Sequence, residues 1–260
     1  MFYKQSELKG IAENSCRKLV NAKENDNFFD VPFKHLFVDN FFPQDFAQRC
    51  LDSFPVINDT DWDAAKDKDI EVKFRTKWES EFDIPDGIVD AIRVMNSSIF
   101  LNAMSKIMGI DKLIPDPYFS GGGLNVTCRG GLLDVHIDGN YHDASGLNRR
   151  LNAILYLNPG WDKSWGGEFG IYDNTGDICV KKIAPIFNRL VIFDTHDKSF
   201  HGLPNPINFP VNQPRKSILL YYYTKELRSA EHILVNEPHS ALWKKRGLSD
   251  KRGNLTRDYD

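Results

Sequence analysis

The stretch LLDVHIDGN at residues 132–140 decides both the fold and the chemistry expected of this chain. Its aliphatic and β-branched residues predict a strand, and the glycine and asparagine that follow predict its end. Side chains two positions apart on a strand share a face, so His136 and Asp138 leave the same face of the strand end. An imidazole and a carboxylate placed there can bind one metal ion, and a third ligand must come from elsewhere.

His201 is the predicted third ligand. It lies in DKSFHGLPNP, soon after the hydrophobic strand RLVIF. Two histidines and one carboxylate on one face of an ion leave three positions open, which is typical of non-haem Fe(II) oxygenases. His196 also follows that strand and competes with His201, whereas His142 lies in the polar loop NYHDASG and is expected to be exposed or to face the substrate. A lone His-x-Asp tripeptide is weak evidence, because it recurs by chance.

A second constellation supports the first. A 2-oxo dicarboxylate that chelates such an ion needs a cation for its distal carboxylate, and arginine is the best donor because its fork bonds both oxygens. Arg215 opens the strand RKSILLYYYT downstream of His201. Ser217 shares its face and can donate a hydroxyl, whereas Lys216 points the opposite way. The joint pattern, more than any one residue, indicates a 2-oxoglutarate site.

The chain divides by texture into a helical first part and a strand-rich second part. Before residue 117 we expect helices: part of residues 1–30, a helix that starts near Pro43, and a helix from Gly87 to Met108 that ends at Gly109. The polar residues 57–80 are expected to form a loop. Beyond Pro117, short strands with turn signals predict an antiparallel sandwich or barrel, and hence an α+β fold. These predicted strands are Gly123–Cys128, Leu132–His136, Leu151–Leu157, Glu168–Tyr172, Ile178–Ile183, Leu190–Phe193 and Ser217–Tyr223.

Composition narrows the class of protein. The 260 residues carry 33 basic and 36 acidic side chains, so the net charge of −3 creates no strong field, and we expect neither nucleic-acid nor membrane binding. Four scattered cysteines and an N-terminus without an apolar segment favour a reduced, cytoplasmic protein without a signal peptide. After Lys225 helical texture is expected to return, ending in a solvated tail that holds a basic cluster around Lys244–Arg246.

The blocks HID, RRLNAILYLNPGW, WGGEFGIYD, NRLVIFDT, SFHGLPNP and RKSILLYYYT resemble, in order, those of the 2-oxoglutarate/Fe(II) oxygenase superfamily, in its prolyl 4-hydroxylase-like branch. The resemblance covers about residues 124–224. It implies a double-stranded β-helix (jelly-roll) core with N-terminal support helices. The whole of 1–260 would then be a single oxygenase domain, with a mainly helical support region at 1–116, the β-helix core at 117–228 and a C-terminal extension at 229–260.

The resemblance also implies roles for individual residues. His136 and Asp138 match the proximal metal ligands, and His201 rather than His196 matches the distal one. Arg215 matches the cation for the distal carboxylate of 2-oxoglutarate, with Ser217 beside it, and Tyr156 matches a tyrosine that bonds the same carboxylate in hypoxia-sensing prolyl hydroxylases. The chain departs from the collagen prolyl hydroxylases, which use lysine where Arg215 stands, and it carries an extra loop, NPINFPVNQP, before that residue.

The function expected from the resemblance is hydroxylation of an aliphatic C–H bond by Fe(II), 2-oxoglutarate and O₂, with ascorbate as a candidate additional reductant. The substrate is peptidyl, with a prolyl residue as the first candidate, or a small metabolite such as an amino acid or sugar. A non-catalytic binding module on the same scaffold is the alternative from another class. Asn140, Tyr141, His142 and Trp165 are the candidate substrate contacts. The sequence makes no prediction of oligomeric state.

Overall fold

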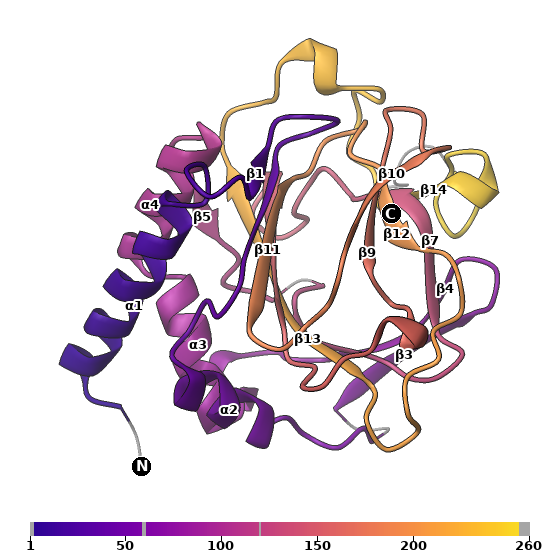
Figure 1. The fold of residues 1–260 in the computed structure, drawn as a ribbon. Coiled ribbons are helices and arrows are strands. Elements are labelled where there is room, and N and C mark those ends of the chain that lie inside the picture. Colours follow the sequence, from indigo (N-terminus) through magenta and orange to yellow (C-terminus); the bar gives the residue numbers. More distant parts are fainter. Residues whose placement is uncertain (1–2, 59–60, 120, 255–260) are drawn as a thin grey trace.

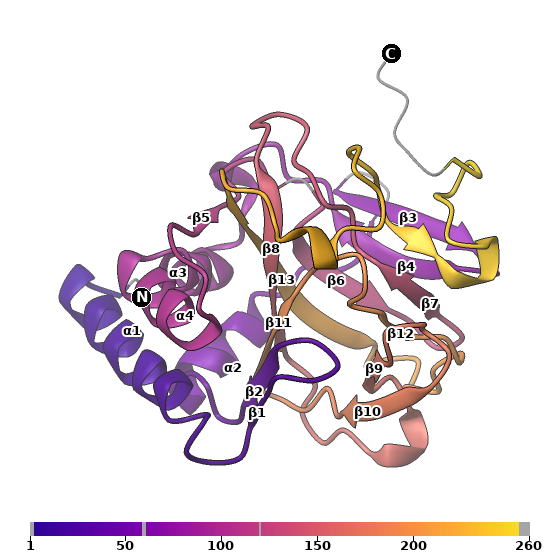
Figure 2. The same ribbon diagram turned by 90° about the horizontal axis from the view of Figure 1, so that it is seen from above.

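The computed structural model describes residues 3–58, 61–119 and 121–254. A layer of helices covers one face of a strongly curled antiparallel sheet (Figures 1 and 2). The fold is therefore α+β, as the sequence predicts. The α-helices are α1 (Gln5–Val20), α2 (Gln44–Asp52), α3 (Asp86–Met95) and α4 (Ser98–Met108). None of the described helices is long and apolar enough to cross a bilayer.

The predicted helix from Gly87 to Met108 is in fact two helices. α3 ends at Asn96, and α4 starts anew at Ser97, whose hydroxyl accepts a hydrogen bond from the Phe100 amide at 3.3 Å. The Ser97 hydroxyl satisfies an amide at the start of α4 that a continuous helix would bond to a carbonyl of the preceding turn. The apolar residues keep their helical spacing on both sides of Ser97, so the sequence pattern does not reveal the break. The predicted ends are confirmed: α2 follows Pro43, and α4 stops at Gly109 with φ of 70°.

The sheet has two limbs that face each other across the interior (Figure 1). The helix-covered limb runs β1-β2-β11-β8-β13-β6, and the other limb runs β7-β12-β9-β10. β4 joins them, because it pairs with β6 through Phe74 and Arg75 and with β7 through Glu71 and Val72. The strands are β1 (Phe28–Phe29), β2 (His35–Val38), β3 (Trp62–Asp67), β4 (Glu71–Thr76), β5 (Ile114–Pro115), β6 (Gly123–Thr127), β7 (Leu132–Ile137), β8 (Asn148–Tyr156), β9 (Phe169–Tyr172), β10 (Cys179–Ile183), β11 (Arg189–Asp194), β12 (His201–Leu203), β13 (Arg215–Thr224) and β14 (Leu242–Trp243).

The buried apolar residues form separate clusters on the two sides of the helix-covered limb. The main apolar core lies between the helices and the helix-covered limb, whereas a smaller cluster that includes Tyr156, Phe169 and Phe193 fills part of the interior between the limbs. A curled sheet with one dry face and a partly polar interior can hold a site without exposing its own core. This arrangement is the double-stranded β-helix that the resemblance implies.

Two expectations are wrong. Residues 57–80 are not a loop, because 62–76 form the β3–β4 hairpin, whose polar side chains face solvent on one side and disguise the strand pattern. The chain after Lys225 contains no described α-helix; it forms the 3₁₀ turns Ala230–His232 and Lys244–Arg246 and the short strand β14 against β7. Its basic cluster is tied down as well, because Arg246 pairs with Asp67 at 2.7 Å and Lys244 with Asp177 at 3.1 Å.

Candidate metal centre

Three ligand-bearing side chains meet at one end of the interior. His136 lies on β7, Asp138 follows that strand, and His201 opens β12, where it is the direct register partner of His136. One ligand atom from each lies within 4.8 Å of the other two. Asp138 Oδ2 is 3.5 Å from His201 Nε2, and Asp138 Oδ1 is 3.8 Å from His136 Nε2. The structure thus brings together the three residues that the sequence singles out as candidate ligands.

The two imidazoles are held in the orientation that a metal requires. His136 Nδ1 lies 2.8 Å from the Asp134 carbonyl oxygen, and His201 Nδ1 lies 2.9 Å from the Ser199 carbonyl oxygen. A carbonyl accepts only from a protonated nitrogen, so in each neutral ring Nε2 keeps its lone pair. Burial, reinforced by His201, lowers the pKa of His136 to about 4, which keeps that ring neutral. Both rings therefore present donor atoms to the space beside Asp138.

Asp138 is held ionised by its neighbours. Asn152 donates to Oδ2 at 2.7 Å, and Arg149 Nη1 lies 3.8 Å from Oδ1. Burial alone would raise the pKa of Asp138, but His201 and the Arg149 guanidinium outweigh it and hold the pKa below its ordinary value. Two imidazoles and one carboxylate make a donor set that fits Fe(II) and leaves positions for other ligands.

Arg149 and Asn152 are site residues that sequence reasoning missed. Asn152 lies on the same strand face as Tyr156 by simple alternation, and that spacing is the signal that could have found it. Arg149 is different, because β8 bulges: Leu151 pairs with Tyr222, but Arg149 pairs with the next residue, Tyr223. The extra residue re-aims Arg149, which stacks over the Tyr221 ring at 3.9 Å. No signal in a single sequence locates such a bulge.

The candidate 2-oxoglutarate residues also lie together. Arg215 and Ser217 are on β13, and Ser217 is the register partner of Tyr156 on β8. Arg215 is 7% exposed; its Nη2 donates to the Tyr156 hydroxyl at 3.2 Å and its Nε to the Gly167 carbonyl at 2.9 Å. Both partners are uncharged, so a carboxylate placed beside this buried guanidinium would supply the opposite charge. The chemistry of these side chains therefore fits one end of a dicarboxylate.

Aromatic packing connects the two groups of residues. Phe193 lies 4.7 Å and Phe169 5.4 Å from the His201 ring, measured between ring centroids. Both belong to the buried apolar cluster that contains Tyr156. Rings packed in this way exclude water from one side of the site and strengthen electrostatic interactions within it.

A pocket of about 810 Å³ opens onto the metal centre. Its lining includes His136, Asp138, Arg149, Tyr221 and Trp243. The β3–β4 hairpin and the C-terminal residues form its outer walls, which carry charges of both signs. This volume is within the usual range of ligand sites, and the walls are unusually polar.

The candidate substrate contacts do not line this pocket. His142 is 2% exposed and bonded to Asp116 at 2.9 Å, so the expectation that it is exposed is wrong, whereas a role facing the substrate stays a prediction. Asn140 accepts a hydrogen bond from the His239 amide at 2.9 Å, and Tyr141 bridges to Asn148. Trp165 packs against Phe209, with ring centroids 5.3 Å apart. Asn140, Tyr141 and His142 directly follow the His-x-Asp motif in sequence, but neither they nor Trp165 are among the residues that line the pocket.

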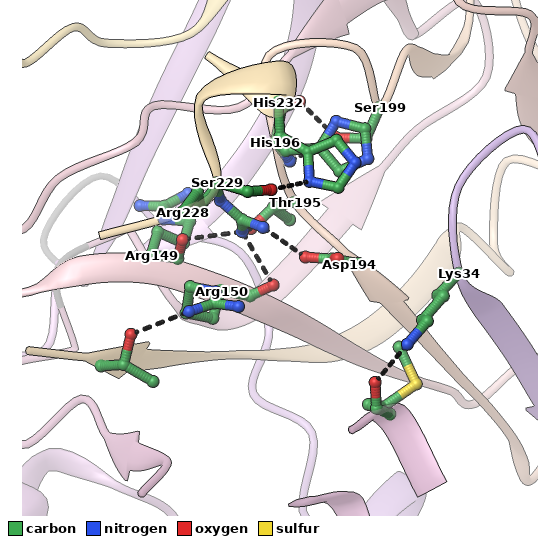
Figure 3. A network of polar contacts seen from close by, with 12 residues as sticks. Lys34, Arg149, Arg150, Asp194, Thr195, His196, Ser199, Arg228, Ser229 and His232 are labelled. Atoms are coloured by element: carbon green, nitrogen blue, oxygen red, sulfur yellow. Dashed lines mark hydrogen bonds and ion pairs between the residues drawn. The ribbon is translucent and has the colours of Figure 1, made fainter. Parts of the chain in front are cut away.

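Two other histidines lie outside the metal centre. His239 is fully buried and contacts Asp197 at 3.2 Å. His196, the rival distal ligand, stacks on His232 with ring centroids 4.3 Å apart and is not part of the metal cluster (Figure 3). Burial lowers the pKa of His196 to about 4.

Gly202 allows β12 to lie close to β7. A Cβ at this position would be 2.7 Å from the Asp134 carbonyl oxygen and 2.9 Å from that of Leu133, both main-chain atoms that cannot move aside. We expect Gly202→Ala to displace β12, separate His201 from His136 and weaken Mn(II) binding at least about tenfold, the effect typical of disturbed ligand support. Calorimetric titration measures this. Gly10→Ala, where an added Cβ meets nothing within 4 Å, controls for general effects, and unchanged metal affinity in Gly202→Ala would contradict the argument.

Comparison with known proteins agrees with this geometry. Residues 122–223 match the sequence profile described as the 2OG-Fe(II) oxygenase superfamily. Prolyl 3-hydroxylase OGFOD1 of Mus musculus is 33% identical over 90 residues, 33% of this chain and 16% of that protein; its Xenopus laevis counterpart is 33% identical over 106 residues, 38% of this chain and 20% of that protein. The match thus spans a fifth or less of either relative.

Solved structures show the same fold. A prolyl hydroxylase from Trichoplax adhaerens, in complex with a peptide fragment of the hypoxia inducible factor oxygen degradation domain, aligns with a TM-score of 0.56 at 18% identity, over 85% of this chain and 94% of its own. A Pseudomonas putida prolyl-4-hydroxylase aligns with a TM-score of 0.53 at 14% identity, over 82% and 100%. The matched segment 122–223, which contains all three candidate ligands, is thus similar to the 2-oxoglutarate/Fe(II) oxygenase superfamily, and the chain shares the fold of these prolyl hydroxylases.

Proposed function

We propose that the chain is an Fe(II)- and 2-oxoglutarate-dependent dioxygenase that hydroxylates a prolyl residue of a polypeptide, with succinate and CO₂ as co-products. The observation that carries the proposal is the meeting of His136, Asp138 and His201 in one cluster, together with a buried Arg215–Tyr156 pair on β13 and β8. A metal centre alone would fit many reactions. The added cation selects an anionic co-substrate.

Each residue has a distinct duty in this reaction. His136, Asp138 and His201 would hold Fe(II), which when bound supplies O₂ activation coupled to oxidation of 2-oxoglutarate. Arg215 and Tyr156 would orient the distal carboxylate of the co-substrate, so that its 2-oxo acid end faces the ion. Asn152 fixes one oxygen of Asp138 and leaves the other for the metal. Such fixed neighbours preserve the ligand geometry while substrates exchange.

The pocket supports a polypeptide substrate. Its volume is about 810 Å³, and its walls come from the β3–β4 hairpin on one side and from residues 240–254 on the other. Main-chain amides and mixed side chains of a polypeptide suit a wall that carries both Arg75 and Asp63, whereas a small metabolite is bound in a more enclosed, apolar pocket. The matched relatives whose names state a substrate residue are prolyl hydroxylases.

Succinate formation tests the proposal. The protein is incubated with Fe(II), ascorbate and 2-oxoglutarate, first alone and then with proline-containing peptides, and His136→Ala is the matched control. We expect succinate above the control, an increase with an accepted peptide, and a gain of one oxygen atom on proline by mass spectrometry. Stimulation by free amino acids or sugars instead of peptides would redirect the substrate assignment. No succinate above the control under any condition would favour a binding module without turnover.

A further inference from the structure

The C-terminal strap, defined here as residues 228–254, follows β13 and pairs with β7 through β14 (Figure 2). It begins at Arg228, whose guanidinium bonds Asp194 at 2.6 Å and also donates to the main-chain oxygens of Arg149 at 2.8 Å and Arg150 at 3.1 Å (Figure 3). One buried cation thus joins the strap to the end of β11 and to the bulge of β8. The strap is therefore fixed to the strands of the site from its first residue.

Asp197 provides the next anchor, in the loop that leads to His201. Its carboxylate accepts hydrogen bonds from the amides of Leu234 at 2.7 Å and Val235 at 3.2 Å, and it contacts His239 Nε2 at 3.2 Å. The same loop supplies the Ser199 carbonyl that orients the His201 ring. Strap and distal ligand consequently share one hydrogen-bonded loop.

A third contact lies beside Asp138. Asn140 accepts from the His239 amide, and its own amide donates to the His239 carbonyl at 3.3 Å. The strap backbone comes so close that a Cβ on Gly139 would be 2.8 Å from the His239 carbonyl oxygen and 3.2 Å from Ser240 Cα. A side chain at position 139 would collide with these main-chain atoms, so a glycine directly after Asp138 is what allows the strap to pack here.

Trp243 makes the most direct contact with the metal centre. It pairs with His136 across β14 and β7, and its ring lies over the imidazole, with centroids 4.7 Å apart and an interplanar angle of 26°. The Trp243 side chain is 2% exposed and lines the same pocket as His136. Its main chain is fixed on the far side as well, because its amide donates to the Ser249 carbonyl at 2.9 Å and its carbonyl accepts from the Leu248 amide at 2.9 Å.

We propose that Trp243 is a positioning residue for His136, and that the C-terminal strap couples its own order to occupation of the metal centre. The hydrogen bond from Nδ1 to Asp134 selects the tautomer of His136 but leaves the ring free to tilt about that bond. The indole face removes that freedom and excludes water from one side of the ring. Because coupling is reciprocal, a bound metal stabilises the strap to the extent that the strap stabilises the bound metal. The inference rests on the proposed function only in requiring a divalent metal at this site.

The test measures metal binding without 2-oxoglutarate or substrate. Mn(II), an air-stable probe for this site, is titrated into the apoprotein and its Kd is measured by calorimetry. Trp243→Ala is expected to raise the Kd about tenfold, which is at the lower end of the effects seen when supporting partners of metal ligands are removed. Trp243→Phe keeps a ring over the imidazole and is expected to bind Mn(II) nearly as well as the unchanged protein. Rescue by phenylalanine separates ring stacking from a general loss of structure.

Fluorescence provides a second readout. A paramagnetic ion bound beside Trp243 should quench that indole strongly, so we expect most of the metal-dependent quenching to disappear in Trp243→Phe. Trp161→Phe removes an indole from a separate apolar cluster and should leave the quenching unchanged. Protection of the strap from limited proteolysis should rise with Mn(II) in the unchanged protein and much less in Trp243→Ala.

The outcomes distinguish the two proposals. If the unchanged protein binds no Mn(II), the metal site itself is wrong and the proposed function fails. If it binds Mn(II), but a folded Trp243→Ala protein binds equally well, Trp243 does not position His136 and this inference is overturned. Equal quenching in Trp243→Phe would likewise place the metal away from the indole and overturn it.

Discussion

Replacing His201 with alanine is expected to lower 2-oxoglutarate turnover by about 1,000-fold or more and to remove most Mn(II) affinity. The metal supplies several kcal/mol of stabilisation to the reaction, and a site with one imidazole and one carboxylate holds the ion too weakly and in undefined geometry. Succinate release measures turnover, and calorimetry measures the affinity. The effect should be this large because His201 is the only one of the three predicted ligands contributed by β12.

His196→Ala is the matched control for His201→Ala. Both histidines are buried, lie five residues apart and flank the same loop, but the His196 ring stacks on His232 instead of facing Asp138. We expect His196→Ala to keep Mn(II) binding and turnover, with some loss of thermal stability from the vacated volume. If the two variants lost metal equally, the assignment of the distal ligand would have to be withdrawn.

Replacing Arg215 with glutamine is expected to raise the KM for 2-oxoglutarate by about 100-fold with little change in Mn(II) affinity. The reason is the loss of a buried charge-assisted contact, which is worth roughly 3 kcal/mol when one partner is truncated. Arg215 bonds Tyr156 and Gly167 and has no contact with the three predicted ligands among its described hydrogen bonds. The KM from succinate assays, set beside the Mn(II) Kd, separates co-substrate binding from metal binding.

Lys216→Gln is the control for that substitution. Lys216 is the next residue of β13, carries the same charge and points to the opposite face, where its ammonium lies 5.0 Å from the centroid of the Phe54 ring. Its replacement should leave the KM for 2-oxoglutarate unchanged. Arg215→Lys should fall between the other variants, because it keeps the charge and loses the fork. An unchanged KM in Arg215→Gln would show that the carboxylate binds elsewhere.

The sequence predicts the parts of this molecule that local geometry controls. Two-residue alternation predicts His136 and Asp138 on one face and Arg215 and Ser217 on another. The structure has His136 on β7 with Asp138 just after its end, and Arg215 and Ser217 on β13. The choice of His201 over His196 needed more than local geometry, because both follow β11 closely. Only the register of β12 against β7 brings His201 to its place.

The missing parts depend on contacts between distant segments. The β3–β4 hairpin has the composition of a loop, because one face is in water and its partners, β6 and β7, lie about 50 residues further along the chain. The basic end of the C-terminal strap is predicted from the sequence to be a solvated tail, because charge patterns describe a segment without its neighbours. In the structure its lysines and arginines find Asp67, Glu71 and Asp177 on strands and loops far away in sequence.

The direct pairing of His136 with His201 across β7 and β12 has an evolutionary consequence. In an antiparallel ladder, two residues lie opposite each other in only one register of the strands. A single insertion or deletion inside either strand would therefore be enough to separate the two rings. The loops on both sides are under no such restriction. Lineages that share this centre can therefore diversify through the length of their connecting segments, such as the proline- and asparagine-rich NPINFPVNQP, while the two short strands keep their residue count.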